Sequence, residues 1–117
     1  MIGKISPLEI IEANFFFPNE DVFKPHPVLV VSTTELFEEE EIFYGVLMTT
    51  KNILPKYTIR IEPTWLTKSS TKEGYFATHF MQIFTMDDVT KRSNTFLKGE
   101  YFDRIKSKII NSVFHEV

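Results

Sequence analysis

Residues Lys24–Ser32 read KPHPVLVVS, and this segment gives the clearest local indication of structure in the chain. The part Val28–Ser32 follows Pro25 and Pro27 and is apolar without a break until Ser32. An uninterrupted apolar run of this length, bounded by turn residues, is typical of a strand that is buried on both faces. We therefore expect a buried strand at Val28–Ser32.

Similar short β-rich segments fill the first two thirds of the sequence, separated by turn residues. The pattern predicts further strands at Leu8–Phe17, Ile42–Thr50, Lys56–Glu62 and Tyr75–Thr85. In Lys56–Glu62 the alternation places Tyr57, Ile59 and Ile61 inward and Thr58, Arg60 and Glu62 outward. We interpret Asp87–Lys91 as one helical turn.

The apolar period changes from Glu100 onward, where apolar residues recur at steps of three and four. This spacing predicts an amphipathic helix. About five short strands followed by one C-terminal amphipathic helix indicate an α+β domain that is mostly β and built on a small barrel.

Length and composition limit the class of protein. At 117 residues there is room for a single domain, residues 1–117, and 43% apolar with 25% charged residues is typical of a globular chain. The absence of cysteine excludes disulfides, a thiolate nucleophile and zinc-cysteine sites, so we expect a cytoplasmic protein. No apolar run reaches the ~18 residues of a membrane span, and no signal peptide is recognisable, so we expect no membrane partner.

Charge is unevenly distributed along the chain. The net charge is -3, but residues 1–58 carry -5 and residues 59–117 carry +2. An anionic ligand should therefore prefer surfaces formed by the second half. We interpret the acidic run Glu38–Glu41 as a solvated loop; the alternative is a charged face after a short helical turn that Ser32 and Glu35 cap. Either interpretation is favoured over a metal site.

The motifs of several enzyme classes are missing. Four glycines and three histidines form no phosphate-binding loop, no nucleophile elbow and no metal-binding histidine pair. We expect no cofactor and no metal. Composition and spacing alone lead to a small soluble barrel with an unknown ligand.

Three segments carry a resemblance to a known family. KPHPVLVVS at Lys24–Ser32 resembles a K-x-R-P-v-l-V-v-S strand, GVLMTT at Gly45–Thr50 is similar to a strand ending v-x-P-i-T-S, and Gly74–Asp88 resembles the strand and turn before a C-terminal helix. In this order and separation they are similar to the MazF/PemK (Kid-like) toxins of bacterial toxin-antitoxin systems. The resemblance extends from about Ile5 to Phe114.

This resemblance implies an SH3-like barrel with a C-terminal helix and a specific activity. The family's members are metal-independent endoribonucleases that cleave single-stranded RNA, act as homodimers and are silenced by a cognate antitoxin. Such cleavage needs a base for the ribose 2′-hydroxyl, cationic donors for the phosphoryl oxygens and an acid for the leaving oxygen.

The sequence departs from the family where the family has arginine. His26 stands at the arginine before the proline, His79 at the arginine of the later strand, and Met81 where some members have a carboxylate. In one interpretation His26 and His79 act as base and acid, while Thr49 and Thr50 bind a phosphate oxygen. In the other, loss of the permanent charge weakens phosphate recognition and leaves the fold with little catalysis.

Further residues are candidates for substrate binding. Lys24 belongs to the first motif, Arg60 lies beside Lys56, and Trp65 lies in the loop before Tyr75. A solvated surface role for Arg60 and a loop-anchoring role for Trp65 are the alternatives. Phe15–Phe17 are interpreted as core or dimer interface before a base-stacking platform.

Two non-catalytic functions remain open. The barrel could bind a protein partner through its C-terminal helix, as the related gyrase-poisoning toxins bind a topoisomerase. It could also bind RNA without cleaving it, although the net charge of -3 counts against a general RNA binder.

Overall fold

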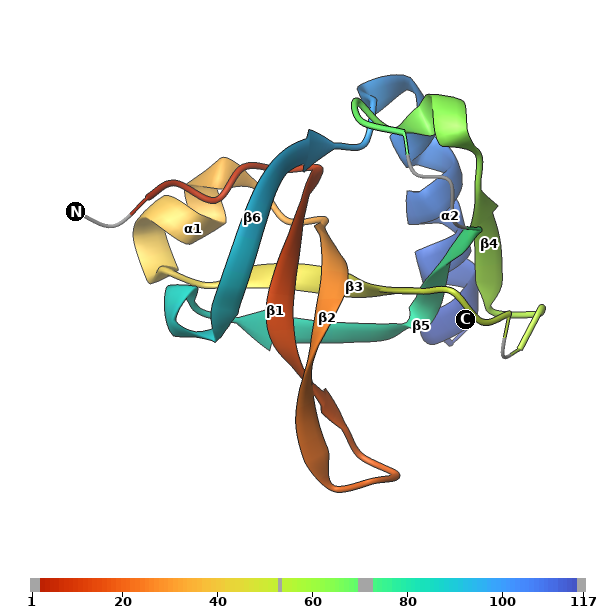
Figure 1. Ribbon diagram of the computed structural model, residues 1–117, viewed down its shortest axis with the longest axis horizontal. Helices are drawn as coiled ribbons and strands as arrows, with labels where there is room; N and C mark the ends of the chain where they lie inside the picture. The colour runs from red at the N-terminus through yellow and green to blue at the C-terminus, as the bar shows by residue number, and fades with distance from the viewer. Residues whose placement is uncertain (1–2, 53, 70–72, 116–117) are drawn as a thin grey trace.

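Six antiparallel strands form one sheet in the computed structural model, which describes residues 3–52, 54–69 and 73–115 (Figure 1). The strands are β1 Glu9–Phe17, β2 Val22–Val30, β3 Phe43–Thr49, β4 Thr58–Ile61, β5 Gly74–Phe84 and β6 Val89–Phe96. The α-helices are α1 Thr34–Glu40 and α2 Phe102–Val113, and the 3-10 turns are η1 Pro63–Trp65, η2 Met86–Asp88 and η3 Gly99–Tyr101. The predicted class, mostly β with a C-terminal helix, is confirmed.

The sheet is open, with the order β4-β5-β3-β2-β1-β6. Its two edges are nevertheless linked by main-chain bonds beyond β4 and β6. The amide of Lys98 donates to the carbonyl of Trp65 at 2.8 Å, and the amide of Thr67 donates to the carbonyl of Phe96 at 2.9 Å. The predicted barrel is therefore present as a sheet whose ends are joined by a short bridge rather than by paired strands.

Residues Asp87–Lys91 were predicted to form one helical turn, but they contain the end of a 3-10 turn and the start of strand β6. The 3-10 turn η2 ends at Asp88, and β6 begins at Val89 and pairs with β1. Most side chains of β6 are exposed because it is an edge strand. A polar edge strand lacks the apolar alternation by which strands are identified in a sequence.

The acidic run lies in a helix, so its interpretation as a loop was wrong. Glu38–Glu40 belong to α1, and Glu41 ends the helix in the left-handed conformation at φ 57°. The N-cap is Thr33, whose side chain accepts from the amide of Leu36 at 3.1 Å. Ser32, the predicted cap, instead accepts from the amide of Tyr44 at 2.9 Å.

The hairpin of β1 and β2 extends from the sheet as an arm (Figure 1). Only Val28–Val30 of β2 pair with β3, so Val22–Pro27 are paired on one side alone. This free edge accommodates Pro25 and Pro27, which have no amide hydrogen to donate. The strand predicted at Val28–Ser32 therefore starts earlier, at Val22.

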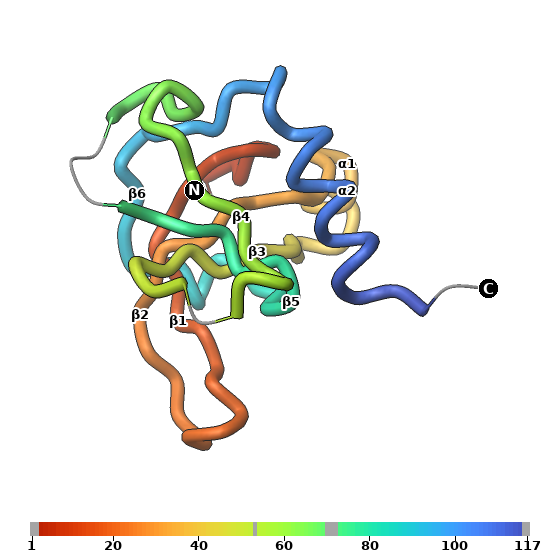
Figure 2. Tube along the Cα trace, turned by 90° about the vertical axis from the view of Figure 1, so that its right-hand side faces the viewer, coloured from red at the N-terminus to blue at the C-terminus, as the bar shows by residue number. Residues whose placement is uncertain are grey.

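Two buried clusters stabilise the domain. One holds Phe15, Phe43 and Phe84 from three strands together with Phe37 of α1. The other contains Phe76 and other sheet residues, together with Trp65 and the buried face of α2. Figures 1 and 2 show α2 lying alongside β4 and β5. None of the described helices is long and apolar enough to cross a membrane.

Strand β4 follows the predicted alternation only in part. Ile61 is buried and Arg60 and Glu62 are exposed, as expected. Thr58, predicted to point outward, is buried at 8% exposure, and its hydroxyl donates to the side-chain oxygen of Asn52.

Candidate functional site

His26 lies on β2 at the base of the hairpin arm and is half-buried. Its Nδ1 is 3.3 Å from the carbonyl oxygen of Met48, and its ring is edge-on to Phe17 at a centroid distance of 5.3 Å. A carbonyl oxygen only accepts, so Nδ1 carries the hydrogen in this contact. Nε2 is then the ring nitrogen left for proton transfer.

Thr49 and Thr50 lie at the end of β3, next to the Met48 carbonyl that holds His26. The Thr49 hydroxyl oxygen accepts from the amide of Lys51 at 3.1 Å, which leaves its own hydrogen free to donate. Thr50 and Lys51 are exposed. Two hydroxyl side chains and one lysine therefore follow directly in the chain on the residue whose carbonyl holds His26.

His79 is positioned by an irregularity in β5. Val46 of β3 pairs with Met81, but the next residue, Leu47, pairs with Ala77, so residues 78–80 have no partner on β3. Bulges of this kind re-aim side chains and are frequent beside active sites. His79, which is half-buried, lies in the middle of this irregular stretch.

The environment of His79 favours its neutral form. Its ring stacks on Tyr57 at 4.7 Å, and its Nδ1 is buried without a hydrogen-bond partner in the described part of the chain. Burial lowers the pKa of His79 below the ordinary 6.5, because it disfavours the charged ring. At neutral pH this imidazole is therefore ready to accept a proton.

Both histidines line one hollow of about 560 Å³, which we call the histidine hollow. Its walls come from the hairpin arm, the loop after β3 and the irregular part of β5. Its lining residues include Phe17, Lys24, His26, Thr49, Thr50, Lys51, Leu54, His79 and Phe80. The structure thus brings together all four predicted catalytic residues.

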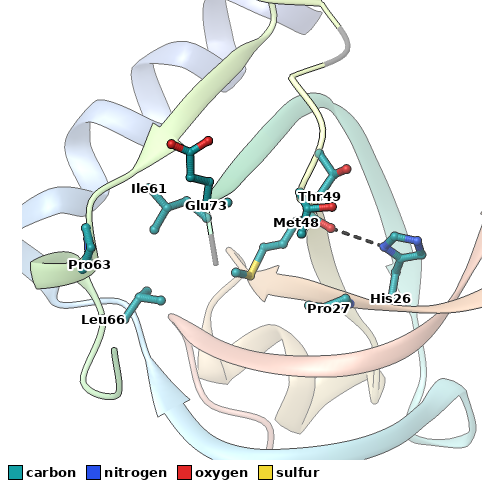
Figure 3. A pocket seen from close by; sticks show the side chains of 10 residues that line it. His26, Pro27, Met48, Thr49, Ile61, Pro63, Leu66 and Glu73 are labelled. Carbon is teal, nitrogen blue, oxygen red and sulfur yellow. Dashed lines mark hydrogen bonds between the residues drawn. The ribbon is translucent and has the colours of Figure 1, made fainter. Parts of the chain in front are cut away.

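A second hollow of about 300 Å³ adjoins the first, and we call it the middle hollow (Figure 3). His26, Thr49 and Thr50 line both hollows. The remaining wall of the middle hollow is mainly apolar and consists of Pro27, Met48, Ile61, Pro63, Leu66, Glu73 and Gly74. The predicted residues therefore stand between a polar and an apolar compartment.

The three predicted substrate-binding residues are placed differently. Lys24 lines the histidine hollow, with its ammonium group 2.9 Å from Glu20. Arg60 is exposed and pairs with Glu73 at 3.3 Å, and it lines neither hollow. Arg60 therefore fits the alternative interpretation, a solvated surface arginine, better than a role in substrate binding.

The structure argues against the prediction that Trp65 stacks on substrate. It is only 5% exposed, and its ring stacks on Tyr101 at 5.2 Å, with the guanidinium of Arg104 5.9 Å from the ring centroid. A buried indole with its ring already stacked is not available to a base. Trp65 therefore fits the alternative interpretation, in which it anchors its loop.

Lys51 and Phe80 are among the residues of the histidine hollow that sequence reasoning did not single out. Lys51 follows the threonine pair directly, and that adjacency was a usable signal. Phe80 had no such signal, because its place depends on the irregular pairing of β5. Within the described residues, no three His, Asp or Glu side chains gather in a group that could hold a metal ion.

Comparison with known proteins yields structural matches only. No family model matches the sequence, and no curated protein matches it. Among solved structures, MazF from Deinococcus radiodurans superposes with a TM-score of 0.75 at 8% identity, covering 94% of this chain and 96% of that one. A mycobacterial endoribonuclease in complex with its cognate antitoxin gives 0.71 at 12% identity, covering 92% and 93%.

A third solved structure agrees with these. The Mycobacterium tuberculosis toxin MazF-mt6 gives a TM-score of 0.65 at 13% identity, covering 89% of this chain and 94% of that one. The chain therefore has the MazF fold over nearly its whole length. At such low identity the likeness establishes the fold alone.

Proposed function

We propose that this chain is a toxin-type endoribonuclease that cleaves single-stranded RNA without a metal ion. The observation that carries the proposal is the convergence of His26, His79, Thr49 and Thr50 on one hollow in a domain with the MazF fold. Two imidazoles at one site match the base and acid that RNA cleavage requires.

The reaction follows from this arrangement. The ribose 2′-oxygen attacks the adjacent phosphorus and gives its proton to the base, while the bond from phosphorus to the 5′-oxygen breaks and the acid protonates that oxygen. The products are a 2′,3′-cyclic phosphate and a 5′-hydroxyl. Lys24, Lys51 and the threonine hydroxyls face the negative charge on the phosphoryl oxygens.

The environments of the two histidines support different roles. His79 is the better base, because burial lowers its pKa and keeps it neutral. His26 is the better acid in its protonated form, in which the Met48 carbonyl accepts from Nδ1–H and Nε2–H is left to donate to the leaving oxygen. On the acidic side of the pH-rate profile, the cleavage rate should then rise with pH, with a midpoint below 6.5. The activity that remains in H79Q should not show this rise.

The direct test is incubation of the purified protein with a long single-stranded RNA in the presence of EDTA. We expect discrete fragments ending in 2′,3′-cyclic phosphate. His26→Ala and His79→Gln should each lower the rate by about 10²-fold or more. His115→Ala is the matched control, because His115 lies beyond α2 and lines neither hollow. Intact RNA at high enzyme excess would refute catalysis.

A second variant separates the active and weakened interpretations. His26→Arg restores the family's residue at this position and removes a group that can transfer protons near neutral pH. If the two histidines catalyse the reaction, H26R loses activity as H26A does. If the histidine merely weakens an arginine site, H26R cleaves faster than the natural protein.

We also propose that the protein works as a homodimer in the cytoplasm and is silenced by a cognate antitoxin peptide. Support for the peptide comes from the mycobacterial neighbour, which was solved with its antitoxin. Sedimentation of the purified protein tests the dimer. Co-expression with a small acidic protein encoded next to it tests the antitoxin.

Non-catalytic binding of a protein partner is the second candidate function. The observation that favours it is an exposed apolar group at the end of α2, where Ile110 is 50% and Phe114 is 60% exposed. Under this alternative, growth inhibition persists when His26 and Thr50 are both replaced, and Ile110→Asp abolishes it. Under the enzymatic proposal the outcomes are reversed.

A further inference from the structure

A third hollow, of about 340 Å³, adjoins the middle hollow and has neither His26 nor His79 in its lining. We call it the lysine hollow; its lining includes Glu12, Lys68, Ser69, Lys91, Ser93 and Thr95. Pro27, Met48 and Leu66 line both the middle and the lysine hollow. Each hollow therefore shares lining residues with the next, and we call the three together the groove.

The lysine hollow is suited to an anion. The ammonium group of Lys68 donates to the carbonyl of Ser93 at 2.5 Å, which holds it against β6. Lys91 is exposed on the same strand. Among the described lining residues, Glu12 is the carboxylate that opposes these two cations, and it already accepts from the Thr90 hydroxyl at 2.8 Å.

The chemistry alternates along the groove. The histidine hollow carries Lys24, which pairs with Glu20, and the exposed Lys51. The middle hollow is mainly apolar and has no lysine or arginine among its described lining residues, and the one carboxylate among them, Glu73, pairs with Arg60. The lysine hollow carries Lys68 and Lys91. Single-stranded RNA alternates in the same way, with phosphates on either side of each base. Single-strand binding sites combine cationic contacts to phosphates with apolar surfaces for bases.

We propose that the lysine hollow is a second phosphate subsite, which binds the RNA backbone beyond the nucleotide whose base occupies the middle hollow. This inference rests on the proposed function, because it assumes that the phosphate to be cut lies in the histidine hollow. RNA is favoured over an acidic peptide because of the alternation of cationic and apolar compartments. The subsite makes the protein prefer substrates longer than a dinucleotide.

The test measures binding of fluorescein-labelled oligonucleotides of two to ten residues that carry 2′-O-methyl groups and cannot be cut. Replacing Lys68 and Lys91 together by Ala should weaken binding of the ten-residue probe about tenfold at low salt. The slope of log affinity against log salt should fall by about 0.7 for each phosphate that the variant no longer neutralises. Binding of the dinucleotide should not change.

Two further proteins serve as controls. Lys98→Ala with Lys106→Ala removes the same charge from residues that line none of the three hollows, so it should leave affinity and slope unchanged. Lys68→Arg with Lys91→Arg keeps the charge and should restore most of the binding. Circular dichroism of each variant verifies folding, since Lys68 also contacts β6.

A cleavage assay distinguishes failure of the second phosphate subsite from failure of the proposed nuclease function. For a long RNA the Lys68/Lys91 alanine variant should raise KM and keep kcat. Normal cleavage with unchanged KM would overturn the subsite and leave the nuclease intact, and absence of both binding and cleavage in the natural protein would overturn both. Unchanged RNA affinity with reduced binding of an acidic peptide would assign the hollow to a peptide partner.

Discussion

Glu9 and Arg92 form the most buried ion pair in the described part of the chain. Glu9 is 2% exposed, and Arg92 approaches both of its carboxylate oxygens at 2.7 Å while also donating to the carbonyl of Lys4 at 2.7 Å. The hydrogen bond to Glu9 raises the pKa of Arg92 above its ordinary value. The pair joins β1, β6 and the segment before β1.

Replacing Arg92 by Ala should therefore destabilise the protein by about 3 kcal/mol, because it leaves the Glu9 carboxylate buried without its counter-ion. The measurement is urea unfolding at pH 7. Lys91→Ala, on the exposed neighbour, should change stability by less than about 0.5 kcal/mol. Equal effects of the two substitutions would show that the pair contributes nothing beyond surface charge.

His79 should make stability depend on pH. Its pKa is lowered in the folded protein, so below about 6.5 the unfolded chain binds more protons than the folded one. Stability is thus lost as pH falls from 6.5 toward the lower folded pKa. His79→Gln removes this contribution, so the difference in unfolding free energy between the two proteins should change from pH 7 to pH 5, in favour of the variant. A constant difference would contradict the effect of burial.

At the scale of single residues, the sequence identified positions better than environments. His26, Thr49, Thr50 and Lys24 follow from motifs along β2 and β3, which are also neighbours in the sheet. The environment of Trp65 could not be predicted, because Tyr101, which stacks on it, is distant in the sequence.

Helix α2 is held to the sheet by a narrow apolar face. Ile105 is fully buried and Ile109 is 7% exposed, and the hydroxyls of Ser112 and Thr78 lie 2.9 Å apart. Ile105→Ala should cost about 2–5 kcal/mol, through reduced transfer energy and a cavity. Ile110→Ala is the matched control on the exposed side, with an expected cost below about 1 kcal/mol. Thermal unfolding of the two variants compares them, and similar midpoints would mean that α2 does not depend on this face.

At the scale of elements, strands with apolar residues were predictable and polar ones were not. The five predicted strands correspond to β1–β5 because each carries an apolar run or alternation. Strand β6 was missed because most of its residues are exposed and its stability comes from pairing with β1. Pairing between strands is also set in three dimensions, so the irregularity of β5 around His79 had no local signal in the sequence.

At the scale of the whole molecule, one sheet separates two clusters that could in principle unfold separately. The cluster around Phe15 includes α1, while the cluster around Trp65 includes α2. Strands β1, β2, β3 and β5 contribute residues to both clusters. Because the same strands serve both, neither cluster can be disrupted without removing the other's support.

We therefore expect the domain to unfold in a single transition. Trp65 is the only tryptophan in the chain and lies in the second cluster, so its fluorescence reports on that cluster, whereas far-ultraviolet circular dichroism reports on the whole sheet. The two signals should give the same urea midpoint. An oligonucleotide that fills the groove should leave Trp65 fluorescence nearly unchanged, because the indole is buried and lines none of the three hollows. A fluorescence midpoint well below that of circular dichroism would instead show that α2 and the edge bridge detach before the sheet unfolds.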